Sequence, residues 1–224
     1  MAPQTRFASE LALAGREISR VRTEVTHSDA AALSPLTPVR ERAAASRAAS
    51  YIWLAATLER VVRDSLSATF REISASAPVL RDLRLSLFAL ICDGEFESVS
   101  AKSRSNSWNA KVSVLHRTVD TSPAVFSEYV LPLDGRTIRA EHLDTIWLVL
   151  GLPLASTPSP LHRVALRDLA DGRNEVAHGH QDPVLFGRSK APGDLLKLTS
   201  RVDDVIVHLL AGLDEYIEKK MYVR

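Results

Sequence analysis

Apolar residues recur along most of the chain at spacings of three and four, which is the period of an amphipathic helix. The longest pattern starts at Thr37-Pro38, where a threonine N-cap precedes a proline at the first helical position. It predicts a helix over residues 37–74 with one continuous apolar face. The apolar residues of this face are Leu54, Leu58, Val61, Val62, Leu66, Phe70 and Ile73.

Shorter helices are expected on both sides of this long one. The same periodicity predicts helices over residues 5–27, 79–91, 107–119, 160–178 and 193–220, and one of about twelve residues that ends at Gly151. Residues 92–106 are predicted to form a loop, and residues 120–138, with two prolines and an Asp-Gly pair, an irregular segment.

Strand signals are few, so the predicted fold class is all-α, a helical bundle with a long loop insertion. We expect a single domain overall. Residues 1–36 would form an N-terminal helix and linker, and residues 37–224 the main helical domain, with the loop-rich insertion at about 92–140.

Composition narrows the class of protein. The hydrophobic fraction of 46% and the charged fraction of 25% are typical of a globular chain with a core. The net charge of +1 gives no general attraction to nucleic acid or to membranes. One cysteine, Cys92, excludes an intrachain disulfide and a Cys-cluster metal site. The first residues lack the order of a signal peptide and no apolar run could span a bilayer, so a cytoplasmic protein is predicted.

Familiar catalytic motifs are absent from the sequence. It contains no Gly-rich phosphate loop, no His-Glu-x-x-His and no Gly-x-Ser-x-Gly. His178 and His180 are the two histidines closest in sequence, and Asp182 is the carboxylate at ligand spacing from them. A metal site at this histidine pair is conceivable but is not the favoured interpretation, and neither a metal nor a cofactor is predicted.

The most informative segment is residues 166–180, LRDLADGRNEVAHGH. As a helix, it places Arg173 on an apolar stripe of leucines and valine, where an arginine costs several kcal/mol unless its charge is matched. Asn174 and His178 lie four residues apart and can form a hydrogen bond that orients the imidazole. Gly179 can end the helix in the left-handed conformation. Arg173 and His178 are therefore candidate functional residues.

These two residues do not share a helix face. Five residues correspond to about 140° of rotation around an ideal helix. A two-fold dimer with two such helices side by side would bring both arginines and both histidines into one cleft.

The segment Arg173-Asn174-x-x-x-His178 resembles the R-(polar)-x-x-x-H motif of the HEPN superfamily, small helical-bundle ribonucleases of prokaryotic defence and toxin systems. The AASYIWLAATLE stretch over residues 48–59, followed late in the chain by L-x-x-L, Arg-Asn and Val-Ala-His-Gly, is similar to the RiboL-PSP-HEPN and MAE_28990-like groups. The resemblance covers roughly residues 40–215. Gly172 departs from it, because relatives more often carry a helix-favouring residue there, and indicates a kink or a close helix contact.

This resemblance implies a metal-independent endoribonuclease acting in a toxin or anti-phage system. His178 would be the general base on the ribose 2′-hydroxyl or the general acid on the leaving 5′-oxygen, and Arg173 would stabilise the transition state. Asn174 would orient His178 or the phosphate. Cleavage would leave a 2′,3′-cyclic phosphate and a 5′-hydroxyl. The expected partners are the RNA, a second copy that completes a composite site, and an antitoxin or larger defence complex.

Several alternatives stay open from the sequence. Arg173 could form an interior ion pair with Glu59, and Glu59 could instead pair with Arg63 or support the site by binding substrate. His180 could contact substrate or remain a solvated loop residue. At the level of function, the alternative to an enzyme is a HEPN-like bundle that binds RNA or a protein without cutting.

Overall fold

A computed structural model describes residues 6–101, 107–126, 131–133 and 137–224 of the chain. Within these residues all regular elements are helices, and extended pairing is limited to two isolated bridges, Val79–Pro123 and Leu83–Val223. The predicted all-α class is confirmed. None of the described helices is both long and apolar enough to cross a membrane.

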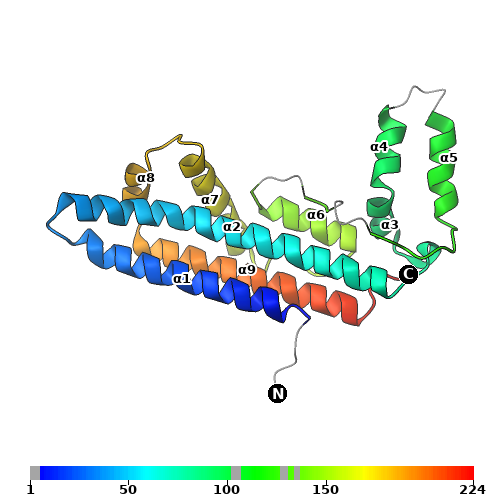
Figure 1. The fold of residues 1–224 in the computed structure, drawn as a ribbon, viewed down its shortest axis with the longest axis horizontal. Helices are drawn as coiled ribbons and strands as arrows, with labels where there is room; N and C mark the ends of the chain where they lie inside the picture. The colour runs from blue at the N-terminus through cyan, green and yellow to red at the C-terminus, as the bar shows by residue number, and fades with distance from the viewer. Residues whose placement is uncertain (1–5, 102–106, 127–130, 134–136) are drawn as a thin grey trace, which may run out of the picture.

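Three long helices form the body of the molecule: α1 (Ala8–Ala32), α2 (Thr37–Ala75) and α9 (Pro192–Glu218) lie lengthwise against one another (Figure 1). Each contributes one buried stripe to a common core, as amphipathic helices must. That core includes Ile18, Val21, Leu54, Leu58, Leu66, Val202, Leu209 and Leu213.

Helix α1 extends to Ala32, five residues beyond the predicted end at Thr26-His27-Ser28. These polar residues do not stop it because Ser28 is buried and its hydroxyl donates to the carbonyl of Val25 at 2.8 Å. The polar group is thus satisfied inside the helix itself.

Two further helices cover α2 from the other side: α7 (Pro160–Ala177) and α8 (Pro183–Ser189) (Figure 1). Helix α8 is only seven residues long and was not predicted from the sequence. Asp182 caps its start by accepting hydrogen bonds from the N–H groups of Val184 and Leu185 at 2.9 and 3.1 Å. Helix α6 (Ala140–Leu150) packs beside α7 and ends, as predicted, at Gly151 with φ of +69°.

The prediction of a loop over residues 92–106 is wrong for its described part. Helices α4 (Asp93–Ala101) and α5 (Ser107–Arg117) form a hairpin that projects from the bundle beside α3 (Leu85–Ile91) (Figure 1). The ion pair between Glu95 and Arg117 joins the two helices. Phe96, Val99 and Leu115 line a largely apolar cavity of about 420 Å³. Helix α4 packs against α5, and this tertiary contact stabilises it. The sequence of α4 alone shows no clear helical period, so the helix was not predicted. Residues 102–106 lie outside the described part.

The helix predicted over residues 79–91 is also interrupted. A short 3₁₀ turn (Leu80–Asp82) precedes α3, and Leu83 and Arg84 between them are extended. Leu83 bridges to Val223, and the guanidinium of Arg84 donates to the carbonyl of Gly151 at 2.9 Å. At Leu83 and Arg84 these bonds to distant residues take the place of helical hydrogen bonds. The described residues between 118 and 139 are irregular, as predicted, whereas residues 127–130 and 134–136 lie outside the description.

Candidate functional site

The C-terminal end of α7 holds both Arg173 and His178. The helix ends at Ala177, and His178 is its C-cap. Gly179 adopts φ of +67°, its N–H donates to Val176 at 3.3 Å, and the N–H of His180 donates to Glu175 at 3.1 Å. These two bonds form a Schellman motif. The predicted left-handed end at Gly179 is confirmed, and it leaves the His178 side chain exposed.

Arg173 is half-buried, and its closest polar partner is the next residue. Its Nη1 donates to the Oδ1 of Asn174 at 3.2 Å, and the hydroxyl of Thr137 donates to the same oxygen at 3.4 Å. Thr137 lies in the segment before α6 and is itself buried. Asn174 therefore links Arg173 to this segment.

Asn174 does not orient the imidazole in this structure. Among the described residues no side-chain hydrogen bond joins Asn174 to His178, and the two share only the helical bond from the His178 N–H to the Asn174 carbonyl at 3.0 Å. The i, i+4 spacing allowed the predicted contact. Thr137 and Arg173 use the amide oxygen instead.

Glu59 is not brought together with Arg173. Gly172 faces Tyr51 of α2, and Glu59 lies eight residues farther along that helix, about 12 Å of helical rise. In the described part of the chain no ion pair joins Glu59 to Arg173 or to Arg63.

The loop after α7 brings two histidines together. The ring centroids of His178 and His180 are 5.7 Å apart, and Nδ1 of His180 lies 4.0 Å from a carboxylate oxygen of Glu175. Both rings are exposed. Among the described residues no three or more His, Cys, Asp or Glu side chains form a group that could hold a metal ion.

Gly172 marks a close helix contact, one of the two explanations its sequence position suggested. A Cβ there would lie 2.5 Å from a ring carbon of Tyr51 and 3.0 Å from Phe186 of α8. The two rings pack edge to face with centroids 5.1 Å apart, and the Tyr51 hydroxyl donates to Asp168 at 3.1 Å. Burial, and then the Asp168 carboxylate, raise the pKa of Tyr51. This contact fixes the rotation of α7 and hence the direction of Arg173.

Replacing Gly172 by alanine is expected to destabilise the protein by about 1–3 kcal/mol, because overpacking against two aromatic rings outweighs the gain in helix propensity. Urea unfolding would measure the change. Gly193 in α9 is the matched control, because a Cβ there meets nothing within 4 Å. Gly193→Ala should leave stability unchanged or raise it, and equal behaviour of the two variants would contradict the close contact.

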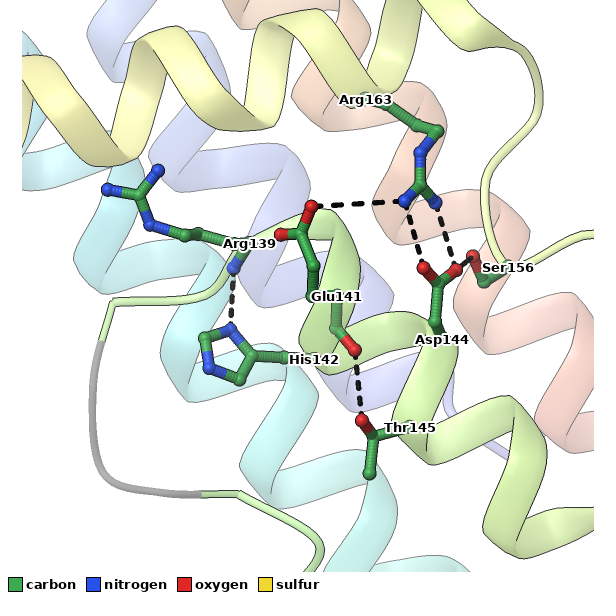
Figure 2. A network of polar contacts seen from close by, with 7 residues as sticks. All are labelled: Arg139, Glu141, His142, Asp144, Thr145, Ser156 and Arg163. Carbon is green, nitrogen blue, oxygen red and sulfur yellow. Dashed lines mark hydrogen bonds and ion pairs between the residues drawn. The ribbon is translucent and has the colours of Figure 1, made fainter.

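Polar contacts also join α6 to α7 (Figure 2). Arg163 of α7 makes a bidentate pair with Asp144 of α6 at 2.9 Å for both bonds, and these bonds lower the pKa of Asp144. At the start of α6, Nη2 of Arg139 donates to Asp171 of α7 at 2.6 Å, and the Arg139 backbone N–H donates to Nδ1 of His142 at 2.9 Å. Sequence reasoning missed Arg139 and Thr137, because neither lies in a recognisable motif.

An all-helical bundle with Arg-Asn-x-x-x-His at the end of a late helix has the features of the HEPN class. The MAE_28990-like HEPN family matches residues 4–222, nearly the whole chain and including α1. The chain belongs to this family, whose members are typically ribonucleases of defence systems. No curated protein and no solved structure matches it.

Proposed function

We propose that the chain is a metal-independent endoribonuclease of a prokaryotic toxin or anti-phage system. The observation that carries the proposal is the end of α7, where an exposed His178 follows a half-buried Arg173 by five residues in a HEPN chain. The fold has little use for either side chain at that position, because His178 is exposed and no ion pair of the described residues joins Arg173 to a carboxylate.

The reaction needs a base, an acid and a positive charge. A base takes the proton of the ribose 2′-hydroxyl, whose oxygen then attacks the adjacent phosphorus. The bond to the 5′-oxygen breaks and that oxygen takes a proton, which leaves a 2′,3′-cyclic phosphate and a 5′-hydroxyl. His178 serves as the base or the acid, a role that imidazole fills near neutral pH.

Arg173 stabilises the extra negative charge that develops on the phosphorane-like transition state. Asn174 acts as a positioning residue, since its amide oxygen holds the Arg173 guanidinium against Thr137. His180, whose ring lies 5.7 Å from that of His178, would contact the RNA. Glu59 lies about 12 Å along α2 from the contact between Tyr51 and Gly172, so a substrate-binding role for it would require the RNA to extend over α2.

The site is composite in this proposal. In the described part of the chain no hydrogen bond joins the side chains of Arg173 and His178, which diverge by about 140° around α7. A two-fold homodimer would place Arg173 of one copy near His178 of the other. An antitoxin or a larger cytoplasmic defence complex would control such an activity.

The purified protein is expected to cleave RNA in excess EDTA and to leave cyclic-phosphate ends, because imidazole and guanidinium groups supply the whole reaction. Gel analysis of end-labelled RNA, with and without a phosphatase specific for 2′,3′-cyclic ends, would measure this. Loss of cleavage in EDTA would contradict the metal-independent mechanism. RNA binding without cleavage at any metal concentration would favour the non-catalytic HEPN module.

A further inference from the structure

The face of α7 that carries His178 binds the side chain of Arg139, which comes from the segment before α6. Positions 171, 174 and 178 are three and four residues apart, so Asp171, Asn174 and His178 share one face. Arg173 leaves the helix about 100° away from Asn174, and its guanidinium reaches back to donate to Asn174 at 3.2 Å. On this face Asp171 accepts a hydrogen bond from Arg139, and Asn174 accepts one from Thr137.

The segment 137–139 is thus attached to α7 at two points. Thr137 binds Asn174 at 3.4 Å, and Nη2 of Arg139 lies 2.6 Å from Asp171. The backbone of Arg139 is held as well, by its bond to His142. Figure 2 shows the Arg139 side chain extending from the start of α6 away from Arg163. Its guanidinium therefore has a defined place on the His178 face.

This guanidinium is open to a ligand. The Arg139 side chain is 35% exposed and its partner Asp171 is 57% exposed. The bond to Asp171 uses one of the five N–H donors of the guanidinium, a planar group that suits phosphate oxygens. Asp171 and His178 are two turns apart, about 10 Å along the helix. If His178 acts at the reacting phosphate, this separation would put Arg139 at a neighbouring phosphate of the RNA backbone.

Resting on the ribonuclease proposed above, we infer that Arg139 is a substrate-binding residue that contacts an RNA backbone phosphate beside the scissile one. Asp171 is its positioning residue. The contact adds an arginine to the histidine face from the same chain, whereas Arg173 would act across the dimer. It binds the substrate before and during the reaction equally, so it contributes to affinity and leaves the chemical step unchanged.

The test is the salt dependence of RNA binding. Binding of a single-stranded RNA would be measured from low to high salt for His178→Ala, which cannot cut, and for the same protein with Arg139→Gln. We expect binding about tenfold weaker with Arg139→Gln. The slope of log affinity against log salt should fall by about 0.7, the value for one phosphate contact on a single strand.

Arg163→Gln is the matched control. Arg163 is also a partly exposed arginine, 38% against 35%, paired with a carboxylate between α6 and α7. It lies fifteen residues before His178, about 22 Å along α7. We expect the RNA affinity and the salt slope of the Arg163→Gln variant to match those of the His178→Ala protein without it. Equal losses in both variants would overturn the inference, because they would indicate a general loosening of α6 on α7.

Kinetics separate this inference from the ribonuclease proposal. In the active protein Arg139→Gln should raise KM about tenfold and leave kcat within about twofold, with partial rescue by Arg139→Lys. An unchanged KM and salt slope would make Arg139 only a bridge between helices and overturn the inference. If wild type binds RNA without cutting and Arg139→Gln still loses one phosphate contact, the ribonuclease proposal fails and the phosphate contact stands.

Discussion

His178→Ala is expected to lower kcat for RNA cleavage by about 10²–10⁴-fold, the usual contribution of a positioned acid or base. Its stability should stay within about 0.5 kcal/mol of wild type, because the side chain is exposed. The His178 ring lies beside the ring of His180, with centroids 5.7 Å apart. Single-turnover cleavage and urea unfolding, measured on the same preparation, would separate the two quantities.

His180→Ala is the control for this prediction. His180 is an exposed histidine in the same loop, two residues away, and its ring faces Glu175. We expect a loss of less than about tenfold, since a substrate contact contributes less than proton transfer. Cleavage by His178→Ala at the wild-type rate would remove His178 from the mechanism. Equal large losses in both variants would show that the two rings act as a pair.

The parts of the fold predicted from sequence are those in which one helix buries one continuous stripe. Helices α2, α7 and α9 satisfy that condition, because each packs along most of its length on the same core. Helix α8 is too short to show a period, although Asp182-Pro183 is a readable start signal. Helix α4 depends on its packing against α5, which sequence periodicity does not reveal.

In the site too, local features could be predicted from the sequence and long-range contacts could not. Arg173, His178 and Gly179 could be predicted because their relation is local, set by the geometry of one helix and its cap. Arg139 and Thr137 could not, because they meet α7 across 32 and 37 residues of sequence and only after α6 has packed. The predicted hydrogen bond from Asn174 to His178 differs from the observed ones for the same reason. Contacts with distant residues decide which hydrogen bonds the Asn174 side chain makes.

Gly187→Ala is expected to be the most destabilising of these substitutions, by about 3 kcal/mol or more. A Cβ at Gly187 would lie 1.8 Å from the carbonyl oxygen of Ala44 and 2.6 Å from its carbonyl carbon. Both are backbone atoms of α2, so no side chain can rotate away. Helix α8 must move off α2 as a unit or α2 must bend, and urea unfolding would measure the cost.

This displacement should also reach the site. Only residues 178–182 separate α7 from α8; Asp182 caps α8, and Gly179 forms the left-handed turn that follows α7. A shift of α8 therefore moves the loop that carries His178, and we expect Gly187→Ala to lose cleavage even below its unfolding midpoint. Gly94→Ala in α4, where a Cβ meets nothing within 4 Å, should retain both stability and activity. A Gly187→Ala protein as stable as Gly94→Ala would mean that α8 does not dock directly on the α2 backbone.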